Sequence, residues 1–360
     1  MLLSVLLLLV GLVVLYFGAE YLVKGASSIA LSLGMTPLLV GLTVVAFGTS
    51  MPELVVSLLA AMAGTVDIAV GNVVGSNIAN IALIVGVAAL ITPMAVDRAL
   101  LRRDYWWMLA FSLGLWALAY FDGSPRITRG DAMVLLVPFA AYILFSIYGA
   151  LKQRQASRVE VAVLEAHDLP EEAARAAIGV AQPEVLEAVK HPVPIWKSAL
   201  FVVGGVVGLV IGAQLMVDNA VTIAKTFGMS DTVIGVTIVA LGTSLPELAT
   251  SVVAALRKEM DISLGNIVGS NIFNIGVVLG AVGLVHPMDI DPSALSFDIL
   301  VMLGVTVLLF VVMIFKRQVS RLGGAALLAA YIAYMVVTFL RVSQAPVVET
   351  VSSLSGMLSL

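Results

Sequence analysis

A 41-residue segment occurs twice in this chain. Residues 41–81 align without a gap with residues 235–275, and 24 of the 41 positions are identical. The offset of 194 positions continues beyond the segment, where Gly86 pairs with Gly280. Self-similarity at one offset predicts a chain built from two copies of a single structural unit.

The composition places both copies in a membrane. The chain has 360 residues, of which 61% are hydrophobic and 12% charged, whereas a soluble domain has about 25% charged residues. A helix needs about 20 apolar residues to cross the hydrocarbon core. The first apolar run has no basic flank and no cleavage site, so we expect a retained span rather than a signal peptide. The sequence therefore predicts an all-α polytopic membrane protein with ten transmembrane helices, near 2–24, 36–62, 68–91, 104–121, 130–151, 197–218, 231–256, 262–285, 296–315 and 322–340.

The two copies are expected to be inverted. Five predicted spans separate equivalent points, and an odd number makes the second copy cross the membrane in the opposite sense, giving two inverted-topology five-helix repeats. With both termini outside, 15 of the 19 Lys and Arg residues face the cytoplasm, as the positive-inside rule requires. The exceptions are Arg126, Arg129, Lys225 and Arg341. We expect a multi-pass protein of the plasma or inner membrane.

These spans divide the chain into four parts. The first repeat is 1–151, a cytoplasmic connection is 152–196, the second repeat is 197–341 and a tail is 342–360. The connection is expected to hold short helices at 170–178 and 183–190. Its acidic cluster (Glu165, Asp168, Glu171, Glu172) lacks the ligand pattern of an EF-hand, so a solvated linker is favoured over a regulatory calcium site.

The residue types exclude several chemistries. The chain has no Cys, and its three His lie in predicted connections. Disulfides and thiolate sites are therefore excluded, and zinc chemistry is disfavoured. A membrane enzyme ranks last, because only two Glu remain within the spans as reactive groups. We expect no cofactor and no nucleic-acid partner.

One acidic motif lies in the middle of an apolar span in each copy. The sequence G-T-S-x-P-E occurs at 48–53 and 242–247, which puts Glu53 and Glu247 at mid-membrane. An ionisable group there costs about 2.5–3.5 kcal/mol and usually marks an ion or proton path. A protonated Glu bonded between helices is the structural alternative, but it would have to occur twice in the same setting. The proline of each motif removes a backbone donor and favours a broken helix whose carbonyls can bind ions.

A polar stripe follows on the next span of each copy. The sequence G-N-x-V-G-S-N-I-x-N occurs at 71–80 and 265–274. Helical spacing puts Asn72, Ser76 and Asn80 on one face, and the second copy repeats this with Asn266, Ser270 and Asn274. The G-x-x-x-G glycines are expected to permit close helix packing.

The two motifs together offer carboxylate, hydroxyl, amide and carbonyl oxygens, and no sulfur or imidazole. Such a set suits hard cations. Two carboxylates neutralise one Ca²⁺, and the same oxygens could instead be divided among Na⁺ ions. Competition for shared ligands would produce exchange.

The paired motifs resemble the two α-repeats of the sodium/calcium exchanger family, within the cation/calcium antiporter superfamily. The resemblance is close over 41–81 and 235–275, and it implies a Na⁺/Ca²⁺ antiporter that works by alternating access, with both ions as substrates and a monomer sufficient for transport. It implies metal ligation by Glu53, Glu247, Thr49, Ser50, Thr243, Ser244, Ser76, Asn80, Ser270 and Asn274, and by the backbone carbonyls of Ala46 and Ala240.

Other implications concern potassium and motion. Some relatives have Asp at the position of Asn274, and its absence makes potassium co-transport less expected. The resemblance also implies that the first and sixth spans slide past the others, and Gly204, Gly208 and Gly212 fit a sliding surface.

Two alternatives stay open at this point. A Ca²⁺/H⁺ antiporter is the nearest, because a buried Glu pair can carry protons. A cation channel that uses the same oxygens as its selectivity filter is less favoured, because broken inverted repeats suit alternating access better.

Overall fold

The computed structural model describes residues 1–33, 35–64, 66–120, 126–165, 194–227, 240–289 and 292–344. Helices dominate, and several carry a turn of π-helix. The elements of the first half are α1 (Leu2–Leu33), α2 (Pro37–Val40), η1 (Gly41–Val45), α3 (Ala46–Thr49), α4 (Met51–Met62), α5 (Val66–Ile78), η2 (Ala79–Ile84), α6 (Val85–Ile91), β1 (Met94–Ala95), η3 (Leu100–Asp104), α7 (Tyr105–Tyr120), β2 (Arg126–Ile127) and α8 (Arg129–Glu165). Those of the second half are α11 (Ile195–Thr226), α13 (Ala240–Gly242), α14 (Leu245–Leu256), α15 (Met260–Phe273), η5 (Asn274–Leu279), α16 (Gly280–Val285), β3 (Met288–Asp289), α17 (Pro292–Ile314), β4 (Gln318–Val319) and α18 (Arg321–Gln344).

Seven helices of the described part are long and apolar enough to cross a bilayer. An eighth span is formed if Pro37–Thr49 and Met51–Met62, which meet at a bend of 42°, are counted together. Two further expected spans correspond to shorter helices. One is α7, and the other is α14, which follows residues outside the described part. The multi-pass helical architecture is confirmed, while the count of ten spans stays a prediction.

The expected cytoplasmic connection begins with helix. Helix α8 continues to Glu165, past the predicted end of its span near residue 151. The two short helices expected at 170–178 and 183–190 lie outside the described residues, as does most of the acidic cluster.

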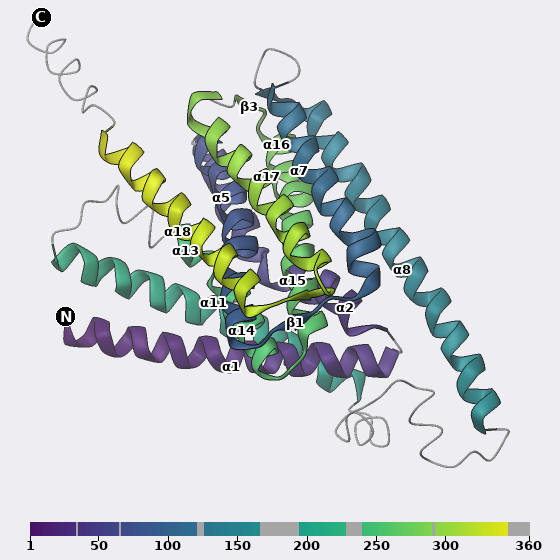
Figure 1. Ribbon diagram of the computed structural model, residues 1–360. Helices are drawn as coiled ribbons and strands as arrows, with labels where there is room; N and C mark the ends of the chain where they lie inside the picture. Colours follow the sequence, from purple (N-terminus) through teal and green to yellow (C-terminus); the bar gives the residue numbers. More distant parts are fainter. Residues whose placement is uncertain are drawn as a thin grey trace, which may run out of the picture.

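The polar stripes lie in the centre of the molecule. Helices α5 and α15 lie inside the molecule together with their π-helical continuations, and α7, α8, α17 and α18 lie around them (Figure 1). Most residues of Ile68–Ile91 and Met260–Val285 are buried, whereas at most a third of the residues in the spans of α1, α8, α11, α17 and α18 are buried. The burial follows from the sequence, because polar groups that must avoid lipid require protein neighbours.

Helices α1 and α11 form a separate pair. They run side by side across one side of the bundle, at a steep angle to α17 and α18 (Figure 1). Glycines allow their backbones to meet: a Cβ added at Gly205 would lie 2.5 Å from the Leu22 nitrogen, and one at Gly208 would lie 3.1 Å from the Gly18 Cα. Close approach of this kind is typical of membrane helix pairs.

The prediction that Gly204 belongs to this glycine surface is wrong. Gly204 meets no atom of the described residues within 4 Å of its added Cβ, so it does not face α1. The contact surface is Gly205, Gly208 and Gly212. Successive residues are separated by about 100° around a helix, so a shift of one position changes the face.

The G-x-x-x-G glycines of the second copy pack as expected. Added Cβ atoms at Gly265 and Gly269 would lie 2.7 Å from the Leu38 carbonyl and 2.5 Å from the Leu42 carbonyl. Positions 232 and 236, which the repeat would place against Gly71 and Gly75, lie outside the described residues.

Short strand pairs join the two halves at both ends. Strand β1 pairs antiparallel with β4, and β2 pairs antiparallel with β3. Each pair connects one copy to the other, so the repeats are tied together outside the helical core as well as within it.

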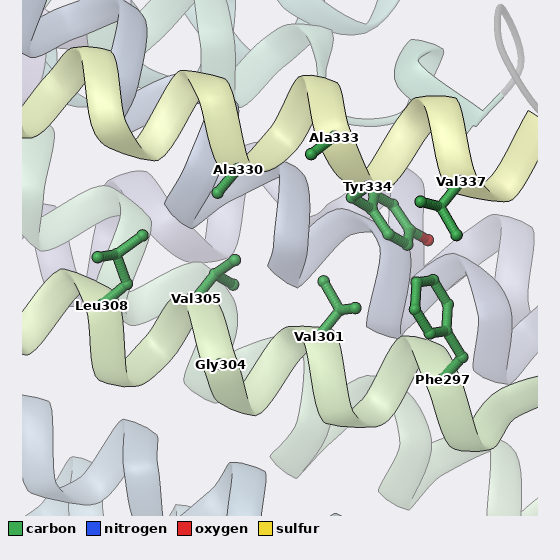
Figure 2. A pocket seen from close by; sticks show the side chains of 9 residues that line it. All are labelled: Phe297, Val301, Gly304, Val305, Leu308, Ala330, Ala333, Tyr334 and Val337. Carbon is green, nitrogen blue, oxygen red and sulfur yellow. The ribbon is translucent and has the colours of Figure 1, made fainter.

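An apolar groove of about 370 Å³ runs between α17 and α18. Phe297, Val301 and Leu308 line one side, and Ala330 and Val337 line the other (Figure 2). No charged side chain lines it. The hairpin of α17 and α18 thus presents a surface suited to lipid chains.

Candidate ion-binding site

The first acidic motif lies at a break between two helices. Helix α3 ends at Thr49, Ser50 leaves helical geometry with φ −87° and ψ 7°, and α4 begins at Met51. Pro52 occupies the first turn of α4, where a missing N–H breaks no helical hydrogen bond. Glu53 therefore lies in the first turn of α4, at the positive end of the helix dipole.

The second motif has the same geometry. Helix α13 ends at Gly242, Ser244 has φ −89° and ψ 3°, and α14 begins at Leu245. Pro246 and Glu247 again occupy the first turn. The predicted break is confirmed in both copies, and it is caused by the same sequence.

Both carboxylates are buried, yet their partners differ. Glu53 and Glu247 each have 0% exposure. Ser50 donates to Glu247 Oε1 at 3.0 Å, and Ser270 approaches the same atom at 3.4 Å. Ser244, the equivalent of Ser50, donates instead to Ser76 at 3.2 Å. The site is therefore shared between the copies but is not strictly symmetric.

The motif threonines join each copy to the stripe of the other. Thr49 Oγ1 lies 3.1 Å from Asn266 Oδ1, and Thr243 Oγ1 lies 3.2 Å from Asn72 Oδ1. These two bonds are equivalent under the 194-residue offset. The G-T-S-x-P-E segment of either copy thus packs against the stripe of the other copy.

The backbone carbonyls expected as ligands sit at the start of the breaks. Ala46 O accepts from Ser50 N at 3.0 Å and lies 3.4 Å from Thr49 Oγ1. Ala240 begins α13, and there Ser244 N donates to Leu241 O.

A π-helical turn begins beside the last Asn of each stripe. Turn η2 starts at Ala79 and η5 at Asn274, so helical register changes where Asn80 and Asn274 point inward. Single π turns inside helices occur often at functional sites. Asn80 Nδ2 donates to Asn271 Oδ1 at 3.0 Å, and Asn274 Nδ2 donates to Asn77 Oδ1 at 3.1 Å.

Sequence reasoning overlooked Asn77 and Asn271. Each donates its amide to the backbone carbonyl of the other, at 3.3 and 3.4 Å, and each accepts from the final Asn of the opposite stripe. They lie on a different face from the predicted stripe. Their presence at equivalent places in both motifs was the signal that could have identified them.

Five buried acceptor oxygens near these contacts have no donor among the described residues. They are Glu53 Oε1, Glu53 Oε2, Glu247 Oε2, Asn80 Oδ1 and Asn274 Oδ1. An unpaired buried acceptor costs about 1–3 kcal/mol, and more when charged. Carboxylate and amide oxygens are ligands that a hard cation prefers. The residues present therefore fit a cation of this class.

No cluster of three or more His, Cys, Asp or Glu occurs within the described ranges. The two carboxylates are accordingly supplemented by neutral oxygens only. This composition differs from that of a catalytic zinc site, which uses nitrogen or sulfur ligands.

Comparison with known proteins agrees with this geometry. A family model described as sodium/calcium exchanger protein matches residues 3–148 and 197–340. The chain is 38% identical over 343 residues to a putative antiporter, CaxA, of Alkalimonas amylolytica, covering 94% of this chain and 99% of the relative. It is 36% identical over 357 residues to the sodium/calcium exchanger MaX1 of Methanosarcina acetivorans, covering 93% and 98%.

A solved structure shares the fold as well. The sodium-calcium exchanger NCX_Mj, studied without Na⁺ and Ca²⁺, superimposes with a TM-score of 0.72 at 30% identity, covering 94% of this chain and 99% of that one. The family model matches two segments of the chain and leaves residues 149–196 between them unmatched. The expected family is confirmed: the chain belongs to the sodium/calcium exchanger family, whose members are membrane transporters and not enzymes.

Proposed function

We propose that this cation/calcium antiporter exchanges Na⁺ for Ca²⁺ by alternating access, with Ca²⁺ bound between Glu53 and Glu247. The name of MaX1 supports Na⁺ as the counter-ion. The many neutral oxygens around the carboxylates support it too, because Na⁺ is a hard cation of low charge that such oxygens can hold.

One observation carries the proposal. Both oxygens of Glu53 and one of Glu247 are buried with no donor among the described residues. Two charges of −1 at this depth are costly unless they are neutralised. A single Ca²⁺ neutralises both, and two or more Na⁺ ions do the same, so each type of ion excludes the other from the same oxygens.

The ligand set of the proposal is the one that the two motifs supply. Carboxylates come from the first turns of α4 and α14, hydroxyls from the breaks before them, and amide oxygens from the ends of the stripes. In full it comprises Glu53, Glu247, Thr49, Ser50, Thr243, Ser244, Ser76, Asn80, Ser270 and Asn274, with the carbonyls of Ala46 and Ala240.

The proposed architecture is two inverted five-helix repeats in the cell membrane, with both termini outside and residues 152–196 in the cytoplasm. Hydrogen bonds that recur at the 194-residue offset support the repeat, such as Thr49 to Asn266 and Thr243 to Asn72. Alternating access is supported by the close pairing of α1 with α11, because their glycines pack these two helices against each other and let them move as a unit.

The experiment is ⁴⁵Ca²⁺ uptake into proteoliposomes loaded with Na⁺, compared with matched K⁺ and proton gradients. We expect uptake driven by an outward Na⁺ gradient and by neither of the others. Uptake driven by protons would replace the proposal with Ca²⁺/H⁺ exchange. Flux that needs no counter-ion would replace it with a channel.

A further inference from the structure

Three arginines line a hollow that contains none of the residues of the proposed ion site. The hollow has a volume of about 330 Å³ and is lined by Arg98, Arg102, Arg317 and Leu101. Two of the arginines precede α7, and the third lies in the connection between α17 and α18. The proposed exchange of ions makes no use of these side chains.

A strand pair holds the two segments together. Met94 and Ala95 of β1 pair with Val319 and Gln318 of β4, and Val96 N donates to Arg317 O at 3.0 Å. The position of Arg317 beside residues 98–102 is therefore set by the backbone and does not depend on flexible side chains alone.

The connection that carries Arg317 has a strained backbone. Lys316 and Arg317 have φ of 60° and 49°, in the left-handed region. That conformation costs a residue other than glycine about 1–2 kcal/mol. The tight connection nevertheless holds Arg317 directly before β4, next to the segment that carries the other two arginines.

The lining arginines have no acidic partner in the part of the chain that the structure describes. Within the described residues, none of the three lies within ion-pair distance of a carboxylate, and all three are exposed. Arg103, by contrast, is paired with Asp104 at 2.8 Å. Asp97 is nearby in sequence, but its Oδ1 accepts from Ala99 N at 2.5 Å. The hollow is thus left strongly positive.

The hollow lies at the boundary between membrane and water. Residues 315–320 connect two membrane-spanning helices directly, so Arg317 must sit at a bilayer surface. Large apolar side chains that lie close to the arginines in sequence are exposed, with Phe315 at 69%, Leu322 at 82% and Trp106 at 51%. Exposed aromatic and apolar side chains next to arginines are typical of the headgroup region.

From this arrangement we infer that the hollow binds the phosphodiester headgroup of an anionic phospholipid in the leaflet that faces these arginines. A guanidinium forms paired, charge-assisted hydrogen bonds to phosphate oxygens, and basic pockets between membrane helices are suited to lipid headgroups. The apolar surroundings favour a lipid over free phosphate, because a lipid's chains would cover them.

The positive-inside rule alone explains only part of this clustering of arginines. The positive-inside rule requires Lys and Arg on one side of the membrane, but it does not require three of them to line one hollow. The positions equivalent to Arg98 and Arg102 are Pro292 and Ser296, and the position equivalent to Arg317 is Gly123, so none of the three carries a charge. The repeat therefore does not produce a second basic hollow of this kind. The leaflet is cytoplasmic under the proposed orientation, and the lipid binding itself does not depend on that orientation.

The test compares two double variants with the wild type. R98Q/R317Q removes two lining charges, and K197Q/K258Q removes two exposed charges that do not line the hollow. Each protein is transferred to vesicles of phosphatidylethanolamine, with and without phosphatidylglycerol. Bound phosphatidylglycerol is then counted by native mass spectrometry, and the melting midpoint is recorded.

We expect wild type and K197Q/K258Q to retain phosphatidylglycerol and to melt at a higher temperature with it. R98Q/R317Q should retain roughly thirtyfold less, given about 1 kcal/mol for each of the two basic residues removed near an anionic surface, while Na⁺/Ca²⁺ exchange in phosphatidylethanolamine alone is unchanged. Equal retention by all three proteins would overturn the inference. So would a wild type that binds inorganic phosphate as well as it binds the lipid.

Discussion

Ser50 of the first copy donates a hydrogen bond of 3.0 Å to Glu247 of the second, although 197 residues separate them. The first copy therefore supplies part of the environment of the second copy's carboxylate. Neither half of the chain would contain the complete proposed site, so the proposed function requires both motifs in one fold.

Replacing either carboxylate by its amide should abolish exchange. Glu53→Gln and Glu247→Gln keep the shape of the side chain but remove one of two negative charges. A unit charge at 4 Å contributes about 4 kcal/mol at an effective dielectric constant of 20. We therefore expect ⁴⁵Ca²⁺ uptake to fall by on the order of a hundredfold or more.

Thermal unfolding separates loss of binding from loss of folding. Because an unpaired buried charge is costly, each Gln variant should melt without Ca²⁺ no lower than wild type. Saturating Ca²⁺ should raise the melting midpoint of wild type, by mass action, and leave that of the variants unchanged. Normal uptake in both variants would remove these residues from the site.

Much of this site could be predicted from the sequence because a helix has regular spacing. The breaks at Ser50 and Ser244 follow from the Thr-Ser-x-Pro pattern, and the stripe of Asn72 and Ser76 follows from four-residue spacing. Asn77 could not be assigned in the same way. It lies off that stripe, and its partners come from a distant part of the chain, so only the packed structure reveals the contact.

The reciprocal pair of amides should stabilise the fold. Asn77→Ala leaves the Asn271 carbonyl and the Asn274 amide without their bonds. Each lost partner in a buried place costs about 1–3 kcal/mol. We expect a clearly lower melting midpoint and reduced exchange, and a similar effect from Asn271→Ala.

Asn219→Ala is the matched control. Asn219 is buried, but among the described residues its amide bonds only to Leu215 O within the same helix. The melting midpoint of this variant should stay close to that of wild type. If all three Asn variants melted alike, the contact between the repeats would have no special importance.

The α1 and α11 surface can be tested by adding one methyl group. Gly205→Ala places a Cβ 2.5 Å from the Leu22 nitrogen, so the two helices must separate. Exchange should fall several-fold, because the helices no longer pack closely. Gly204→Ala adds the same group where no described atom lies within 4 Å, and it should transport like wild type. Equal rates for the two variants would argue that close packing of α1 against α11 is not needed for exchange.

One ion pair should bias the motion of α1 in a single direction. Arg257, at the end of α14, is paired with Glu20 of α1, and Glu259 accepts from Ser27 at 2.9 Å nearby. The equivalent positions in the other copy are Ala63 and Gln214, which cannot form an ion pair. The link therefore stabilises the described position of α1 on one side of the membrane only.

The two side chains of this pair are 37% and 25% exposed, so the pair contributes at most about 1 kcal/mol and is weakened by salt. Arg257→Gln should change the exchange rate by up to about fivefold in low salt and very little in high salt. The charge-reversed double variant E20R/R257E should restore the wild-type rate, while each single reversal does not. A double-mutant cycle with no coupling in low salt would show that the pair has no influence on the movement of α1.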